Sequence, residues 1–354
     1  MSRNVTILLI FNVILSTLVV LSSHHFFTIW IGLEMNTLSI LPVLVYQFSA
    51  RSVESTVKYF LVQSFSAAII LNVGLIQAWI FSSWSIFHPL NILTSSLLSL
   101  ALALKLGLFP CHYWFPDVIQ GISFLQGLIL STWQKVAPFV VLSYVIGSLN
   151  GTIIVLSSVM SVLVGGWGGL NQTQVRKILA FSSIAHIGWI CSVVYYSSTT
   201  AFVMFFVYII INSCVFLLMS ELGFTSLSSI SRLAFLNWMV GFITILIILS
   251  LGGLPPLTGF LIKFLALECL VNNVSFTVSV LLAGGSLISL FYYLRIAFNS
   301  SLIFFPQHSL TMFLWRSLSG YGSIFSVYGV FLSVITSISL FGLFFFPVLG
   351  SVIE

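Results

Sequence analysis

Apolar residues fill almost the whole chain, and short polar breaks divide them into eleven stretches. A helix that spans a membrane needs about 20 consecutive apolar residues. The predicted spans are residues 5–23, 26–48, 56–80, 94–120, 122–148, 151–170, 177–197, 200–222, 236–271, 274–299 and 323–348. No polar stretch is long enough for a soluble domain. The pattern therefore predicts one all-α polytopic membrane domain over residues 1–354, with about eleven transmembrane helices.

Two spans, 94–120 and 236–271, are long and contain helix-breaking residues. These residues are Gly107, Pro110 and Pro116 in the first span, and Gly252, Gly253, Pro255 and Pro256 in the second. Backbone groups freed by such residues must be satisfied by protein or water, because lipid offers no hydrogen bonds. Two discontinuous helices in corresponding halves of a chain point to a transport site.

The two breaks have similar sequences, LGLFP at residues 106–110 and LGGLP at residues 251–255. An odd number of spans separates them, so the second copy would be inverted in the membrane. This predicts inverted five-helix repeats, the first over residues 5–148 and the second over 151–299. Residues 323–348 would form a terminal helix outside the repeats.

Composition supports a membrane protein, because 59% of the residues are hydrophobic and only 5% are charged. An ordinary soluble domain is about 25% charged. The net charge of +5 comes from basic residues scattered singly in loops, not from the basic stripe of a nucleic-acid-binding protein. The cysteines show no metal-binding spacing. We therefore expect no nucleic-acid partner, and no flavin, iron–sulfur cluster or metal in this chain.

The loop charges are strongly one-sided. If the N-terminus lies on side one, that side receives all the loop cations: Arg3, Arg51, Arg176, Lys177, Arg232, Arg295 and Arg316. The opposite side receives histidines but no Lys or Arg. Positive loops mark the cytoplasmic side of a membrane, or the matrix in an organelle. The pattern predicts an N-terminus on that side and a C-terminus on the other.

Four lysines lie inside apolar stretches: Lys58, Lys105, Lys135 and Lys263. A charge at the bilayer centre costs about 2.5–3.5 kcal/mol or more, so such residues usually face a watery interior and mark an ion or proton path. A buried lysine can exchange its proton readily. The alternative is that a lysine extends its ammonium group to the interface. This alternative is strongest for Lys58, which lies near the start of its span.

Glu34 is an acid within the second span, where it would be protonated or paired with a cation. A lysine from the fourth or fifth span could pair with it, and a neutral carboxyl bonded to a neighbouring helix is the alternative. His112 and His186 are possible proton relays, because histidine titrates near neutral pH. Each could equally be a neutral side chain bonded to a carbonyl group or water.

Four segments now carry a family resemblance: KLGLFPCHYWFPDVIQG, STWQKVAPF, GGLNQTQVRKILAFSSIAHIGW and LGGLPPLTGFLIKF. Together they resemble the chain 2 family of antiporter-like membrane subunits of mitochondrial NADH:ubiquinone oxidoreductase, respiratory complex I. The resemblance covers most of the chain and weakens after about residue 300. Cys111 stands where the family commonly has phenylalanine, which leaves the adjacent His112 in place.

The resemblance implies a proton-translocating subunit in the mitochondrial inner membrane, with its N-terminus in the matrix. By motif, it assigns the proton pathway to Glu34, Lys105, Lys135 and Lys263. It implies that the chain belongs to an enzyme, an NADH:ubiquinone reductase, whose NADH, FMN, iron–sulfur clusters and ubiquinone are bound elsewhere. Its partners would be the other membrane subunits and the lipids of the inner membrane.

Two other functions fit the same residues. A stand-alone cation/proton antiporter would share the repeat architecture and would exchange Na⁺ for H⁺ as an isolated chain. A purely structural membrane scaffold would tolerate substitution of the lysines without loss of pumping.

Overall fold

A computed structural model of the chain describes residues 3–301 except 47, 224 and 231–237, together with 333–340 and 342. These residues are helical almost throughout, and the described part contains no β-strand, only two isolated bridges. This confirms the predicted all-α class. It follows from the apolar composition, because a helix satisfies its backbone hydrogen bonds within itself.

The helices follow the predicted spans closely. The first half contains α1 (Arg3–Ser22), α2 (Phe26–Leu44), α3 (Ala50–Phe81), α4 (Ile92–Leu106), α5 (Trp114–Gly121), α6 (Phe124–Ser131), α7 (Trp133–Val145) and the short 3₁₀ turn η1 (Ile146–Ser148). The second half contains α8 (Gly151–Leu170), α9 (Val175–Val194), α10 (Ser198–Leu222), α11 (Leu227–Ile230), α13 (Trp238–Gly252), α14 (Gly259–Asn272) and α15 (Phe276–Ser301).

In the described part of the chain, eight helical stretches are long and apolar enough to cross a membrane. Two of the three remaining predicted spans are the broken ones, each divided into shorter pieces, α4 with α5 and α13 with α14, and the third is the terminal span. The predicted terminal helix, residues 323–348, lies mostly outside the described residues. Within it, residues 333–340 are helical.

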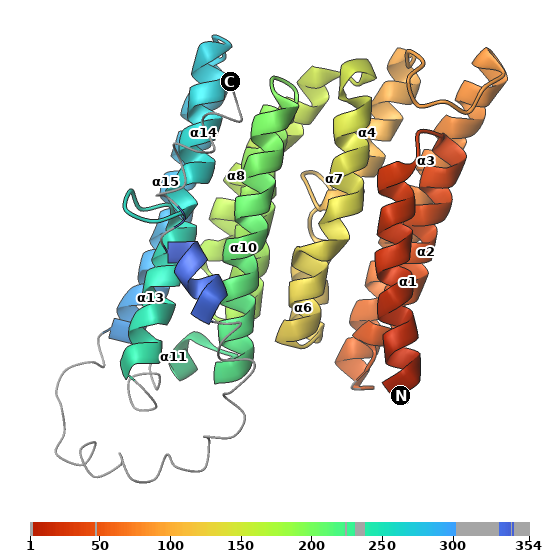
Figure 1. Cartoon of the computed structure of the whole chain (residues 1–354). Helices are drawn as coiled ribbons and strands as arrows, with labels where there is room; N and C mark the ends of the chain where they lie inside the picture. The colour runs from red at the N-terminus through yellow and green to blue at the C-terminus, as the bar shows by residue number, and fades with distance from the viewer. Residues whose placement is uncertain are drawn as a thin grey trace, which may run out of the picture.

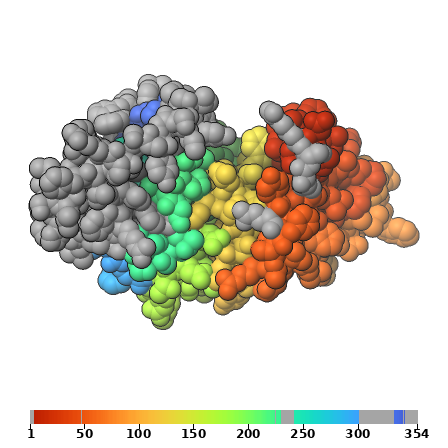
Figure 2. All heavy atoms as spheres, turned by 90° about the horizontal axis from the view of Figure 1, so that it is seen from below, coloured from red at the N-terminus to blue at the C-terminus, as the bar shows by residue number. Residues whose placement is uncertain are grey.

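The helices stand side by side, roughly parallel to one another, with the N-terminal and C-terminal halves of the chain at opposite ends (Figure 1). Helices α1–α3 lie at one end, α6, α7 and α10 in the middle, and α13–α15 at the other end. In the view from below, the red and orange N-terminal helices and the blue α15 lie on opposite sides, with the yellow and green helices between them (Figure 2).

Small residues bring the helices of the second half close together. A Cβ atom added at Gly188 of α9 would lie 2.2 Å from Ser161 Oγ of α8, and one at Gly166 would lie 3.0 Å from the Gly285 carbonyl oxygen of α15. Close backbone approach at small residues is a usual way to pack helices in lipid. It makes α8, α9 and α15 a rigid frame.

A third interruption occurs at Thr132, inside the predicted span 122–148 and six residues before Pro138, which lies within α7. The Thr132 hydroxyl donates a hydrogen bond to the Leu128 carbonyl at 2.7 Å, and Thr132 has φ −113° and ψ −74°. Threonine side chains compete with the helix for backbone partners in this way. The result is a bend between α6 and α7, three residues before Lys135.

Candidate functional site

The first break is a helix end built on a glycine. Gly107 has φ +76°, its N–H contacts the Leu104 carbonyl at 3.3 Å, and the Leu108 N–H bonds to the Ala103 carbonyl at 2.9 Å. This is the Schellman pattern, which favours glycine because the backbone is left-handed there. The Trp114 indole N–H also donates to the Leu104 carbonyl, at 3.1 Å. The break therefore leaves its carbonyl groups satisfied inside the membrane.

Lys105 lies in the last turn of α4, directly before this break, and only 3% of its surface is exposed. Its ammonium group lies 3.5 Å from both the backbone carbonyl and the side-chain Oε1 of Gln63 on α3. These are long hydrogen bonds to uncharged oxygens. Lys105 is therefore buried as predicted, without an interfacial ammonium group.

Glu34 lies on α2, where the Thr37 hydroxyl donates to its carboxylate at 3.1 Å. The side chain is half-buried. Glu34 and Lys105 interact electrostatically, but they are beyond ion-pair distance, since the ion pairs of the described residues both involve Lys58. The predicted pairing is thus an interaction at a distance and not a direct contact.

Lys135 lies in the first turn of α7, just after the Thr132 bend, and is 2% exposed. Its ammonium group is 3.4 Å from the Ser183 hydroxyl on α9. It also lies 4.2 Å from the centre of the Phe115 ring and 5.7 Å from that of Tyr208. Aromatic faces attract cations, and more strongly where water is excluded. The site can therefore hold a charged amine without a carboxylate beside it.

Lys263 lies on α14, just after the second break, and is half-buried. Its ammonium group donates a hydrogen bond to the Gly252 carbonyl at 2.5 Å. Gly252 ends α13, so this carbonyl is one of those left free by the break. The lysine itself thus satisfies the interrupted backbone, as Trp114 does at the first break.

His186 lies on α9 and is largely buried, with 8% of its surface exposed. Lys135 and Lys263 both act on it electrostatically, and its ring is 6.1 Å from that of Tyr208. His112 is 1% exposed and lies in the loop after the first break, where Nδ1 is 3.2 Å from the Pro110 carbonyl. The structure therefore places His186 on α9, one turn after the Ser183 that contacts Lys135, and places His112 beside the first break.

Lys58 differs from the other three lysines. Its side chain is 45% exposed and forms ion pairs with Glu54, at 2.7 Å, and Asp117, at 3.8 Å. It lies two turns from the start of α3. Of the two alternatives left open for Lys58, the structure therefore favours the one in which its ammonium group extends to the surface, as a charged side chain this close to a helix end can do.

Several polar partners in this interior were not predicted. Gln63, Ser183 and Tyr208 bind or face the lysines, and the Tyr208 hydroxyl donates to the Ser131 carbonyl, next to the Thr132 bend, at 2.8 Å. Of these, only Ser183 had a signal in the sequence, because it lies one helical turn before His186 in SSIAH. The partners on other helices had no sequence signal.

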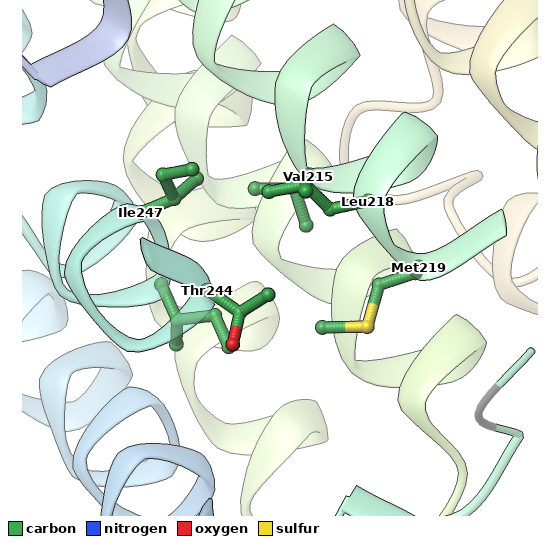
Figure 3. Close-up of a pocket in the computed structure, with 6 residues that line it drawn as sticks. Val215, Leu218, Met219, Thr244 and Ile247 are labelled. Atoms are coloured by element: carbon green, nitrogen blue, oxygen red, sulfur yellow. The ribbon is translucent and has the colours of Figure 1, made fainter. Parts of the chain in front are cut away.

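The gap between α10 and α13 is apolar and closed to water. It is lined by Val215, Leu218, Met219, Thr244, Ile247 and Ile248 (Figure 3). Its empty space is about 140 Å³ in total, but no part has room for a water molecule.

Comparisons with known proteins give a consistent result. Residues 23–289 match the family described as NADH:quinone oxidoreductase/Mrp antiporter, TM. The chain is 63% identical over 354 residues to NADH-ubiquinone oxidoreductase chain 2 of Patiria pectinifera, covering 100% of both chains. It is 58% identical to the chain 2 protein of Pisaster ochraceus, covering 99% of each.

Solved structures share the fold. One chain of respiratory complex I from Thermus thermophilus with bound aureothin superposes with a TM-score of 0.79 and 27% identity, over 87% of this chain and 72% of that chain. A chain of the Mrp complex from Dietzia sp. gives a TM-score of 0.74 at 18% identity, over 82% of this chain and 59% of that chain. The second similarity concerns the fold alone.

Proposed function

Because the chain belongs to the NADH-ubiquinone oxidoreductase chain 2 family, we propose that its buried lysines carry protons across the mitochondrial inner membrane for respiratory complex I. The pathway runs from Glu34 and Lys105, through Lys135, to Lys263. Redox chemistry and its cofactors belong to other subunits, and this chain contributes proton movement only.

This proposal rests on one observation: the buried lysines have uncharged partners. The amines of Lys105, Lys135 and Lys263 contact uncharged oxygens, from Gln63, Ser183 and Gly252. A lysine bound to a carboxylate is fixed in its charged form, since losing the proton would leave an unpaired buried anion. A lysine beside a hydroxyl or carbonyl oxygen avoids this penalty, so it can release and regain a proton.

In this scheme Glu34 is a negative charge whose distance from Lys105 can change. It acts on Lys105 through space without touching it, so a small movement of α2 or of the carboxylate changes the stability of the lysine's charged form. Movement elsewhere in the complex would thereby bias Lys105 toward release of its proton to Lys135. His186, which interacts with both Lys135 and Lys263, lies on the next step.

We also propose that the N-terminus faces the matrix. Following the chain through the helices, the starts of α3 and α9 and the end of α15 lie at the same end of the bundle as the N-terminus. These positions carry Arg51, Arg176, Lys177 and Arg295. His24 and His88 lie near the opposite helix ends. The distribution supports the positive-inside assignment.

The inverted-repeat relation between residues 5–148 and 151–299 is proposed on the similarity of the two breaks. Each ends a helix at a glycine with positive φ, +76° at Gly107 and +75° at Gly253, and each has a buried or half-buried lysine beside it. A superposition of the two segments that fails to overlay these breaks would exclude the relation.

The test is Lys135→Met in the assembled complex, reconstituted into proteoliposomes. Methionine keeps much of the apolar stem and removes the proton-binding amine, and the desolvation penalty is lost with the charge. The complex should assemble, while the number of protons translocated per NADH oxidised falls. Lys135→Arg should fail in the same way, because arginine keeps its proton.

Wild-type pumping in Lys135→Met would remove Lys135 from the pathway and favour a structural role. Pumping restored by arginine would mean that a fixed charge suffices. The antiporter alternative predicts Na⁺/H⁺ exchange by the isolated chain in liposomes, and the full-length similarity to complex I subunits argues for the assembled complex instead.

A further inference from the structure

Two neighbouring tyrosines of α15 have buried hydroxyl groups without a hydrogen-bond partner in the described part of the molecule. Tyr292 is 0% exposed and Tyr293 is 2% exposed, and neither hydroxyl makes a hydrogen bond. A buried polar group without a partner is costly and rare, and lipid cannot supply one. Each of these hydroxyls therefore has the capacity for a further hydrogen bond.

Tyr293 lies directly beside the second break. A Cβ atom added at Gly252 would lie 3.6 Å from both Cβ and Cδ2 of Tyr293, so the tyrosine packs against the residue whose carbonyl binds Lys263. The Tyr293 hydroxyl approaches Ser182 of α9 and the hydroxyl of Tyr292 without meeting the geometry of a hydrogen bond. The base of the Tyr293 side chain therefore lies beside the second break, and its hydroxyl lies toward Ser182 of α9.

Ser183 and Tyr208 lie next to Lys135. Ser182 and Ser183 are adjacent on α9, and the Ser183 hydroxyl is 3.4 Å from the Lys135 amine. Tyr208, whose ring faces the same amine, interacts electrostatically with Tyr293. Hydroxyl-bearing residues of α9 and α10 thus lie at Lys135, and Tyr293 of α15 packs beside the glycine that binds Lys263.

We propose that the hydroxyls of Ser183, Ser182 and Tyr293 form, with bound water, the passage by which a proton moves from Lys135 to Lys263. At each step an oxygen accepts a proton on a lone pair and releases its own hydroxyl proton to the next oxygen. One proton leaves the Lys135 ammonium group and one arrives on the Lys263 amine. Each hydroxyl ends neutral, so no buried phenolate forms.

This inference rests on the proposed function and adds Tyr293 as a proton-relay residue. A relay role requires the phenol oxygen, whereas packing against Gly252 requires only the ring. A purely structural tyrosine would bond its hydroxyl to a neighbouring carbonyl, as Tyr208 and Tyr144 do at 2.8 and 3.0 Å. Tyr293 does not, which leaves its oxygen available to water.

The experiment compares Tyr293→Phe with Lys135→Met in the assembled complex, reconstituted into proteoliposomes. The readout is protons translocated per NADH oxidised, with assembly checked on a native gel. Tyr293→Phe should lose the same share of pumping as Lys135→Met, and the double variant should lose no more than either alone, because both interrupt one path in series. A structural defect at a separate site would instead add to the loss.

The matched control is Tyr144→Phe. It also removes a tyrosine hydroxyl, one that donates to the Leu21 carbonyl at the opposite membrane end of α7, and should leave the proton ratio at its wild-type value. If Tyr293→Phe fails to assemble, Ser182→Ala replaces it. The Ser182 hydroxyl otherwise bonds only within its own helix, to Leu179, and alanine is favoured in helices.

Wild-type pumping in Tyr293→Phe, or in Ser182→Ala where the tyrosine variant does not assemble, would overturn the passage if Lys135→Met still loses pumping. Wild-type pumping in Lys135→Met would overturn the proposed function itself. The two failures are therefore distinguished by the same set of variants.

Discussion

Gly253→Ala should disable Lys263 without removing it. Gly253 follows the end of α13 and has φ +75°. A Cβ atom there would lie 2.7 Å from Lys263 Cε, 2.8 Å from Cδ and 2.8 Å from Nζ. Because these atoms belong to a flexible side chain, the lysine can move aside. In doing so it leaves the Gly252 carbonyl, with which its amine forms a 2.5 Å hydrogen bond.

Two terms contribute to the cost of this substitution. The left-handed backbone costs an alanine about 1–2 kcal/mol. Loss of a hydrogen bond to a charged group costs about 1.5–3 kcal/mol, which is roughly tenfold or more in the equilibrium that it controls. The backbone strain lowers stability and hence assembly, whereas the lost hydrogen bond acts on Lys263 itself. Gly253→Ala should therefore lower proton pumping more than it lowers assembly.

Gly223→Ala is a control that introduces the backbone strain without displacing a lysine. Gly223 ends α10 with φ +66°, and a Cβ atom there would meet nothing within 4 Å. It therefore carries the backbone strain alone. Gly107→Ala is a second control, at the other break, because its Cβ would make only ordinary contacts, 3.6 Å from Phe115 Cβ.

The assay is the yield of assembled complex together with protons translocated per NADH oxidised. All three alanine variants should assemble less well than wild type, to a similar degree. Gly253→Ala alone should also lower the proton ratio. If Gly253→Ala and Gly223→Ala gave the same proton ratio, the reasoning about the Lys263 contact would be refuted.

Two further predictions concern the ends of the helices. Lys58→Met should leave the proton ratio close to wild type, because its ion pairs with Glu54 and Asp117 are solvent-exposed; a loss equal to that of Lys135→Met would return Lys58 to the pathway. In mitoplasts, the loop at residues 170–177 should resist protease or label added from the intermembrane side, and cleavage from that side would contradict the matrix orientation.

The spans and the two long interruptions could be predicted because each depends on local sequence. Apolar length determines where a helix can cross, and Gly107 and Gly253 end helices through their own backbone freedom. The depth of Lys105 and Lys135 could also be predicted, since each lies well inside its apolar run. For Lys58 the sequence left two alternatives open, because its position relative to the helix end decides whether its ammonium group reaches the surface.

The partners of the lysines could not be predicted, because they come from other helices. Gln63 binds Lys105 across 42 positions of sequence, and Ser183 binds Lys135 across 48. The Thr132 bend was also missed, since threonine is common in unbroken helices and disrupts one only when its hydroxyl takes a backbone carbonyl. These features depend on packing, which a single sequence does not reveal.

The scarcity of carboxylates around the lysines has a consequence for coupling. At an effective dielectric constant of about 20, moving a carboxylate from about 8 to about 5 Å from an ammonium group changes their interaction by roughly 1.2 kcal/mol. That is close to a tenfold change in proton occupancy. Had Glu34 been in contact with Lys105, separating the two would cost far more, because a buried charge would lose its partner. On the proposed pathway, the gap between Glu34 and Lys105 thus lets a small displacement control a proton without breaking an ion pair.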